Sequence, residues 1–497
     1  MPDTSTVQSS IPAAPSFDST REAALLLLTT LGTVMVAVDS TIVILALPTM
    51  SRDLGSPLQT IIWTILIYLL IAAALTTQCG RVGDLLGRSR VYNSGFAIFT
   101  VGSALCGFAP NALVLIAARA IQAIGGSVMI ANAGALIAYV FPPQRRGRSF
   151  GFFVLGWSLG AILGILLGGV ITTTLGWRYI FFINLPIGIV ATALGLRLLP
   201  VTVGRPARFD IPGCVSFSAS LALLCYGAVE IAASGASTFY VACVLTGVVL
   251  LALFALIELR TPDPMLDLRQ LRGRLLGFSL ASGLLQSIGY LSVIFLLTLY
   301  LQGIRGLSPL DASLLLIPGY LVGAVIGPIT GRMVDRIGPR ALSTAGIALM
   351  GVSVIAYAQM GLSTWLGWIP VVSTVSGFGI GMFFPANTTA IMSQARPETF
   401  GSISGLRGTL LNVGTLLSFV VTLSIASASV PRYVAYQVFL GVGTLSTAYG
   451  HQFLVGLHTA LYGSALVLVG AAAFSWFRGR HDPAPPAWRP AGNSPKP

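Results

Sequence analysis

Two charged residues, Asp39 and Arg119, lie inside long apolar runs of the chain. A carboxylate or a guanidinium at the centre of a membrane span costs about 2.5–3.5 kcal/mol even on a mild insertion scale, so each needs a partner or a role. Asp39 lies nine residues before Pro48 and Arg119 nine residues after Pro110, which places both about 13 Å from the same membrane surface. They could face one cavity, where the carboxylate takes up and releases a proton. The alternative is an ion pair that only ties two helices together.

The motif Gly-Arg-x-x-Asp-x-x-Gly occurs twice, at 80–87 and again at 331–338. Each copy joins two apolar runs. Its glycines allow a tight turn, its aspartate can face an arginine or a helix N-terminus, and its arginines anchor the loop. Two copies at equivalent places indicate duplicated halves and favour a paired gate, whereas a single copy would be explained equally well as a tight basic loop. The predicted gating residues are Gly80, Arg81, Asp84, Gly87, Arg88, Gly331, Arg332, Asp335 and Arg336.

Glycines recur every four residues in two of the apolar runs. The first set is Gly156, Gly160, Gly164 and Gly168, with Gly169 beside it, and the second is Gly319, Gly323, Gly327 and Gly331. Small residues at this spacing let helices approach closely, because lipid supplies no hydrophobic drive for helix association. We interpret the first set as a hinge or rocking surface; simple packing is the alternative.

Polar and aromatic side chains within the apolar runs are candidates for lining a substrate cavity. They are Gln122, Asn132, Trp63, Trp157, Gln286, Tyr290, Phe384, Asn387 and Asn412. A large apolar cavity with few fixed polar groups suits broad substrate recognition. Arg407 is expected to extend to the inner membrane interface. His451 and His458 share one helical face, where packing is favoured over a proton relay.

The composition requires the apolar runs to be membrane helices. Of 497 residues, 55% are hydrophobic and 9% charged, with a mean hydropathy of +0.86, whereas soluble chains carry about a quarter charged residues. The runs reach roughly 20 residues and lack the alternation of barrel strands. We predict fourteen spans, near 24–47, 58–79, 91–109, 112–140, 149–173, 180–200, 210–230, 238–259, 276–302, 310–331, 341–361, 366–392, 402–428 and 453–476.

The net charge of +13 lies in the loops rather than along one stripe, which argues against nucleic-acid binding. With the N-terminus inside, most arginines fall on the side of the membrane that holds both termini. Only four fall on the other side, namely Arg52, Arg178, Arg305 and Arg432. By the positive-inside rule, both termini are therefore cytoplasmic.

No sequence pattern supports catalysis or a bound cofactor. The segment 156–160 matches the GxSxG elbow of serine hydrolases, but it lies within a span and lacks the strand-to-helix turn that the elbow needs. Metalloprotease, phosphate-binding and dinucleotide-binding motifs do not occur. The five cysteines form no CxxC pair and are interpreted as packing residues. We expect no enzyme, no metal site and no cofactor.

The segment 80–90 resembles the loop motif of the major facilitator superfamily. The stretches 38–48, 119–126, 176–186 and 300–309 are similar to the fourteen-helix drug:proton antiporter branch of that superfamily. The resemblance covers about residues 30 to 475. It implies an all-α membrane protein of the major facilitator fold, with two six-helix bundles, two extra transmembrane helices and both termini cytoplasmic. The domains are then a disordered tail (1–23), the N-terminal bundle (24–200), a linker with the two extra helices (201–275), the C-terminal bundle (276–476) and a disordered Pro-rich tail (477–497).

The resemblance also implies roles for individual residues. The family associates the aspartate that matches Asp39 with proton coupling, and the motif that contains Arg119 with proton transfer. In the fifth span, the family has Gly-Pro where this chain has Gly164 and Ile165. That stretch is associated with antiport, so uniport stays open.

The sequence therefore predicts a secondary active transporter that exports hydrophobic or amphipathic drugs and toxic compounds by alternating access. Protons are the expected coupling ion. The expected partners are the lipid bilayer and small hydrophobic or cationic substrates, with no nucleic acid, and the protein is expected to function as a monomer in the plasma (inner) membrane. The alternative is a dedicated exporter of one metabolite, antibiotic or lipid.

Overall fold

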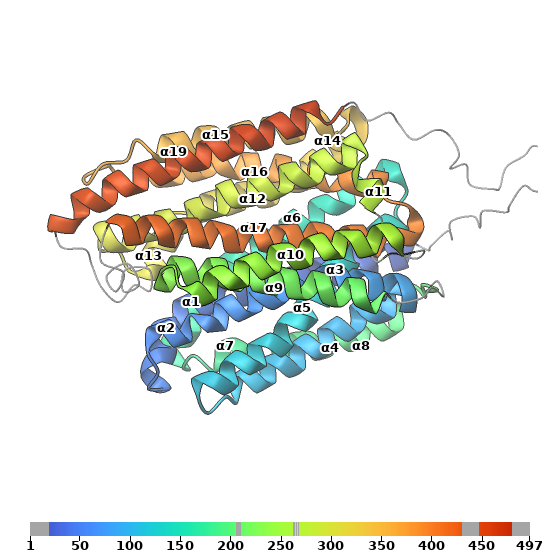
Figure 1. The fold of residues 1–497 in the computed structure, drawn as a ribbon, viewed down its shortest axis with the longest axis horizontal. Coiled ribbons are helices and arrows are strands. Elements are labelled where there is room, and N and C mark those ends of the chain that lie inside the picture. The colour runs from blue at the N-terminus through green and yellow to red at the C-terminus, as the bar shows by residue number, and fades with distance from the viewer. Residues whose placement is uncertain are drawn as a thin grey trace, which may run out of the picture.

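The computed structural model describes residues 19–204, 210–261, 264, 266, 268–429 and 447–479, and all regular structure within them is helical (Figure 1). Most of the two predicted tails lies outside the described residues, as does Arg432. The long helices are α1 (Ser19–Asp53), α3 (Trp63–Leu86), α4 (Arg88–Gly107), α5 (Ala112–Val140), α6 (Pro143–Thr174), α8 (Asn184–Leu198), α9 (Ile211–Ser234), α10 (Thr238–Arg260), α12 (Arg274–Thr298), α14 (Ile317–Ile337), α15 (Pro339–Tyr357), α16 (Trp368–Gln394), α17 (Phe400–Ser429) and α19 (Thr447–Phe477). The short ones are α2 (Leu58–Ile61), α7 (Tyr179–Phe182), α11 (Leu268–Leu271), α13 (Pro309–Leu314), the π-helix η1 (Leu299–Ile304) and the 3₁₀-helix η2 (Pro397–Thr399).

Eleven of the helices in the described residues are long and apolar enough to cross a membrane. The long helices α4, α12 and α17 lie among them in the same bundle (Figure 1). The predicted span 180–200 is divided at Ile183 into α7 and α8. Pro186 explains the division, because a proline has no N–H to donate to the carbonyl four residues earlier and its ring crowds that carbonyl.

The two copies of the repeated motif end in the same backbone conformation. Gly87 separates α3 from α4 with φ of 99°, and Gly338 separates α14 from α15 with φ of 82°. Only glycine adopts such angles readily. The spacing of the motif therefore ends both helices in the same way, and in each copy the aspartate lies in the last turn of the preceding helix.

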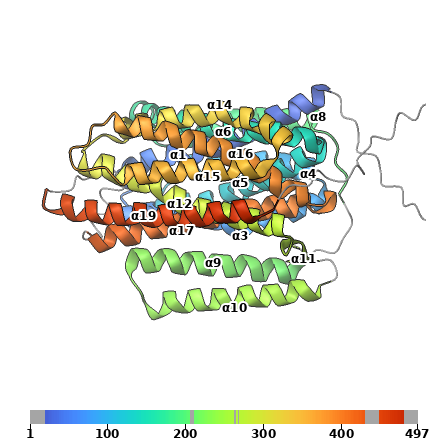
Figure 2. The same ribbon diagram turned by 90° about the horizontal axis from the view of Figure 1, so that it is seen from above.

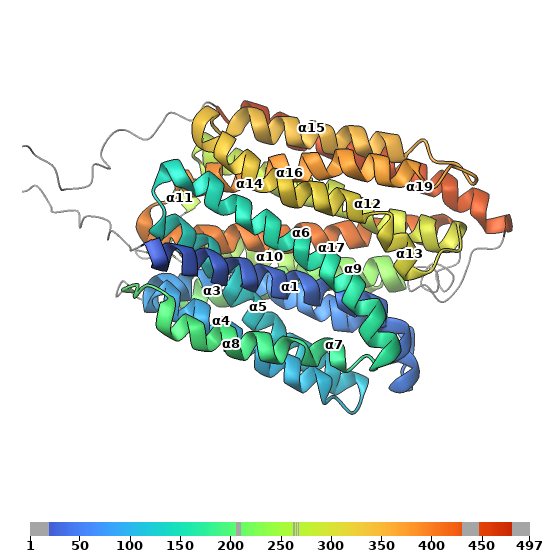
Figure 3. The same ribbon diagram turned by 180° about the vertical axis from the view of Figure 1, so that it is seen from behind.

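Two pairs of helices form seams between the parts of the chain before and after α9 and α10. We call α1 to α8 the N-half and α12 to α19 the C-half. The α3–α17 seam and the α6–α14 seam are each formed by one helix from either half, and Figure 3 shows α6 and α14 side by side. In the second seam, a Cβ on Gly151 would lie 2.8 Å from the carbonyl oxygen of Gly327. Small residues let the two backbones meet here.

The glycines of α6 allow close packing against two neighbouring helices, α1 and α14. A Cβ on Gly160 would lie 2.6 Å from the Cβ of Ala37, and one on Gly156 would lie 3.0 Å from the carbonyl oxygen of Thr30, so these glycines face α1. Gly164 faces α1 as well, close to Thr41. Gly147 and Gly151, earlier in α6, face α14. The helix is thus packed closely against both its own half and the opposite half.

The helices α9 and α10 lie on one side of the bundle, and α10 is the outer of the two (Figure 2). α9 contacts both α3 and α17, and Gln78 Nε2 of α3 donates to Ser218 Oγ at 2.8 Å. Ser237 caps α10 by accepting from the backbone N–H of Tyr240 at 3.3 Å. Only 17% of the apolar window of α10 is buried, as expected for a helix whose side chains face lipid.

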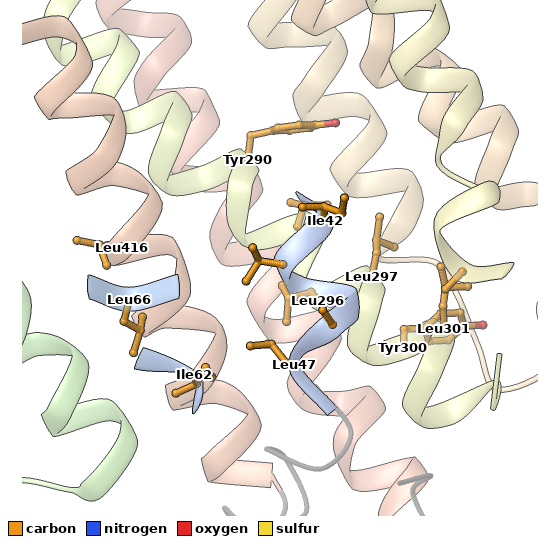
Figure 4. Packing of buried hydrophobic residues seen from close by; sticks show 14 of the residues in the cluster. Ile42, Leu47, Ile62, Leu66, Tyr290, Leu296, Leu297, Tyr300, Leu301 and Leu416 are labelled. Carbon is orange, nitrogen blue, oxygen red and sulfur yellow. The ribbon is translucent and has the colours of Figure 1, made fainter. Parts of the chain in front are cut away.

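Apolar side chains close the end of the bundle that carries Asp53. Ile42 and Leu47 of α1 pack there against Leu296 and Leu297 of α12 and against the start of η1 (Figure 4). All four of these side chains are 2% exposed or less. The N-half and the C-half are therefore joined by a water-excluding contact at this end.

Candidate functional site

The centre of the N-half contains a fully buried ion pair. Arg119 Nη1 of α5 lies 2.6 Å from Asp39 Oδ2 of α1, and the two residues are 1% and 0% exposed. Arg119 Nε also donates to the carbonyl oxygen of Thr64 at 3.0 Å. The aromatic ring of Tyr68 lies under the guanidinium, 4.6 Å from its carbon. The two residues that the sequence placed at one membrane depth are in direct contact.

Gln122 holds both members of this pair. Its Oε1 accepts from Arg119 Nη1 at 2.6 Å, and its Nε2 donates to Asp39 Oδ1 at 2.8 Å. Nε2 also lies 2.6 Å from Ser103 Oγ of α4. Gln122 was predicted as a cavity residue, but the structure places it one helical turn after Arg119, inside the polar cluster around Asp39.

Two members of the cluster were not found from the sequence. Ser103 Oγ accepts from Asn184 Nδ2 of α8 at 3.1 Å, and Asn184 Nδ2 lies 3.4 Å from Asp39 Oδ1. Asn184 belongs to the stretch 176–186, whose resemblance to the family was the one sequence signal for its importance. No sequence signal marks Ser103, because single serines are common in membrane helices. We call Asp39, Ser103, Arg119, Gln122 and Asn184 the polar cluster.

The opposite end of the bundle is closed by Asp84, the aspartate of the first repeated motif. Its Oδ1 and Oδ2 accept from the backbone N–H groups of Gly401 and Ser402, both at 2.9 Å, in the first turn of α17. Arg88 donates to Asp84 Oδ1 at 2.7 Å. A carboxylate at a helix N-terminus meets unpaired N–H groups and the positive end of the helix dipole.

Asp335, the aspartate of the second motif, makes the matching contact at the other seam. Its two carboxylate oxygens accept from the backbone N–H groups of Gly147 at 2.7 Å and Arg148 at 3.0 Å, near the start of α6. Each copy of the motif therefore joins the two halves through a carboxylate that accepts from two successive backbone N–H groups near the start of a helix. The predicted gate residues Arg81, Arg332 and Arg336 make no ion pair within the described residues.

A small cavity lies in the C-half between α12, α16 and α17. Its volume is about 20 Å³, room for one water molecule. Three of the predicted cavity residues line it, namely Gln286, Phe384 and Asn387, and Arg407 lines it as well. This cavity is therefore too small for an organic substrate in the conformation that the structure shows.

The other predicted cavity residues lie elsewhere. Asn132 is buried between α5 and α3 and donates to the carbonyl oxygen of Cys79 at 3.0 Å. Trp63 stacks on Tyr226 of α9 with ring centres 5.7 Å apart. Trp157 is 41% exposed on the outer side of α6. Tyr290 belongs to the apolar contact in Figure 4, and Asn412 is half-buried on α17 outside the cavity lining.

The histidines and cysteines form no metal centre in the part of the chain that the structure describes. His458 bonds through Nε2 to the carbonyl oxygen of Met360 at 2.7 Å, and His451 is exposed. The five cysteines are buried, and none forms a disulfide within the described residues.

Residues 29–419 match the model described as the major facilitator superfamily. The chain belongs to this superfamily. It is therefore a multi-pass membrane transporter with an all-helical fold.

Individual relatives agree with this assignment. The chain is 31% identical over 458 residues to a puromycin resistance protein of Streptomyces alboniger, covering 89% of this chain and 88% of the relative. It is 30% identical over 394 residues to a riboflavin transporter of Clostridioides difficile, covering 79% and 85%. Among solved structures, a proton:xylose symporter of the superfamily shares the fold, with a TM-score of 0.61, 15% identity and coverage of 93% and 96%.

Proposed function

We propose that this transporter exports hydrophobic or amphipathic compounds and that proton entry drives the export. The observation that carries the proposal is the buried polar cluster, because one titratable carboxylate lies in its centre and bonds to three different side chains. The relation to a puromycin resistance protein supports export of drugs. In this proposal the chain crosses the plasma membrane fourteen times, as two six-helix bundles with α9 and α10 between them, and has both termini in the cytoplasm.

Protonation of Asp39 would change the balance of charge within the cluster. The neutral acid no longer pairs with Arg119, which keeps its bonds to Gln122 and to the carbonyl oxygen of Thr64. Arg119 is then a buried cation without a counter-charge, a costly state that favours a rearrangement of α1 against α5. Release of the proton on the inner side restores the pair and resets the carrier.

The α3–α17 seam with Asp84 and the α6–α14 seam with Asp335 form the inner gate. When α3 moves away from α17, Asp84 leaves the N–H groups of Gly401 and Ser402, and when α14 moves away from α6, Asp335 leaves Gly147 and Arg148. The glycines at both seams allow the helices to close again without a gap. One proton crossing a potential of about 100 mV supplies roughly 2.3 kcal/mol, which supports a concentration gradient of about 40-fold.

The relation to a riboflavin transporter favours a second candidate, a carrier dedicated to one compound. Proteoliposomes that contain a pH-sensitive dye separate the two candidates and also test the coupling. Puromycin, riboflavin and ethidium are added in turn, and proton movement is recorded for the wild type and for Asp39→Asn. The proposal expects proton movement with several of these compounds and none in the variant. Movement with one compound alone supports the dedicated carrier, and coupled movement that persists in Asp39→Asn contradicts the role of Asp39.

A further inference from the structure

Two arginines inside the halves, Arg119 and Arg407, differ in their surroundings. Arg119 of the N-half is paired with Asp39. Arg407 of the C-half, two turns into α17, lines the cavity between α12, α16 and α17 and makes no hydrogen bond or ion pair with any residue that the structure describes. Placing a guanidinium inside a span is costly, so an arginine without a protein partner points to a partner from outside the chain.

The cavity is lined by further polar atoms without hydrogen-bond partners and by no negatively charged side chain. Gln286 is 1% exposed, and its Oε1 is buried without a hydrogen-bond partner, as is Nε of Arg407. None of the residues that line the cavity is acidic. Most of the remaining surface is apolar, including Leu284, Phe383 and Leu410.

A second guanidinium, that of Arg478, is bonded to a residue that lines the cavity. Asn387, which lines the cavity, accepts from Arg478 Nη1 through Oδ1 at 3.0 Å. Arg478 also donates to the carbonyl oxygen of Pro339 at 2.7 Å and has no carboxylate partner among the described residues. The electrostatic potential in this cavity is therefore positive, which repels cations and attracts anions.

We propose that this cavity is the subsite for the acidic group of an amphipathic substrate, with Arg407 as its counter-charge. The inference rests on the proposed function and names one class of its substrates, organic acids with an apolar body. The planar guanidinium would hold a carboxylate through two parallel hydrogen bonds. Phe383, Leu284 and Leu410 would contact the apolar body. In this conformation the space admits only water, so the acid enters after the helices that line the cavity have moved apart.

Equilibrium binding to the purified protein in a neutral detergent tests the inference without any proton gradient. Three probes share one fluorophore: pyrenebutyrate, its neutral methyl ester, and pyrenylbutyl-trimethylammonium. The wild type is expected to bind the carboxylate at least tenfold more tightly than the cation. Arg407→Gln is expected to weaken carboxylate binding about tenfold or more and to leave the ester unchanged, while Arg407→Lys retains part of the preference.

Arg197→Gln is the control, because it removes the same charge from an exposed position in the last turn of α8. It should leave all three affinities unchanged. Equal binding of the three probes, tighter binding of the cation, no binding of the carboxylate, or an Arg407→Gln variant that keeps its preference for the carboxylate would overturn the proposal. Gln286→Leu supplies a second variant if Arg407→Gln does not fold, and it should also reduce carboxylate binding more than ester binding.

A competition arm identifies the source of the acid. Displacement of pyrenebutyrate by phosphatidylglycerol in the micelles assigns the subsite to an acidic lipid, and unchanged binding assigns it to a dissolved acid. Both results support the acidic subsite. The binding assay measures no transport, so the two proposals can fail separately. Proton coupling can be absent in proteoliposomes although the protein prefers the carboxylate, and proton coupling can be present although it does not.

Discussion

Asp84 and Asp335 make the same contact at opposite seams of the molecule. Each carboxylate accepts from two successive backbone N–H groups near the start of a helix in the other half, Asp84 from α17 and Asp335 from α6. They differ in one respect. Arg88 pairs with Asp84, whereas Pro339 occupies the equivalent place in the second motif. The first seam thus carries a buried charge pair that the second lacks.

This difference predicts unequal effects of neutralising the two aspartates. Asp335→Asn removes a carboxylate from two backbone N–H groups near the start of α6, an interaction of about 0.3–2 kcal/mol. Asp84→Asn removes the same interaction and also leaves Arg88 buried without its counter-charge, which costs about 3–5 kcal/mol in other buried pairs. Thermal unfolding of the purified variants should therefore show the larger loss for Asp84→Asn. The double variant Asp84→Asn with Arg88→Met should recover part of that loss, and equal losses for the two single variants would contradict the assignment.

Replacing the turn glycine Gly338 is predicted to lower stability through its backbone conformation alone. At Gly338 a Cβ would meet nothing within 4 Å, yet φ is 82°. Gly338→Ala should therefore destabilise the protein by about 1 kcal/mol or more. Gly351 in α15 is the matched control, since a Cβ there also meets nothing within 4 Å and φ is not positive. Gly351→Ala should leave the melting temperature unchanged or raise it, because alanine favours helix.

Gln122 is predicted to be essential to the polar cluster. Gln122→Leu removes its bonds to Asp39, Arg119 and Ser103 at once and leaves buried groups unsatisfied, at a cost of about 1–3 kcal/mol for each such group. The variant should unfold at a lower temperature and lose substrate-induced proton movement in proteoliposomes. The control is Gln359→Leu, whose exposed amide donates to Tyr462 at 3.0 Å. Normal proton movement in Gln122→Leu would show that the cluster is only structural.

The packing of α6 against α1 predicts that Gly160 tolerates no side chain. A Cβ there would lie 2.6 Å from Ala37 Cβ and 2.7 Å from the carbonyl oxygen of Val34, so the backbones must separate. Gly160→Ala should slow export by at least tenfold in vesicle assays if α6 moves against α1 during transport. Gly463→Ala, where a Cβ meets nothing within 4 Å, should export at the normal rate. If both variants export normally, the glycines are not a moving surface.

The sequence predicted those features that depend on order along one helix. The turns at Gly87 and Gly338 follow from the repeated motif, and the common depth of Asp39 and Arg119 follows from the helical rise. The all-helical fold and the superfamily are confirmed by the family match and by the helices of the structure.

Features that depend on the approach of distant helices could not be predicted. No local pattern marks Gly401 as the partner of Asp84, because the contact exists only where α3 crosses α17. Trp157 lies in an apolar run, as a cavity residue would, but it is on the face of α6 that points away from the other helices. The sequence predicts Arg407 to be an interfacial arginine, because the cavity beside it exists only where α12 and α16 pack against α17.

The side position of α9 and α10 limits how a compound dissolved in the lipid can reach the interior. α9 contacts α3 and α17 at once and so covers the α3–α17 seam from the membrane, with α10 outside it (Figure 2). The α6–α14 seam lies on the other side of the bundle, and no described helix covers it there (Figure 3). Of the two seams between the halves, the α6–α14 seam is therefore the one at which we expect membrane-borne compounds to enter from the lipid.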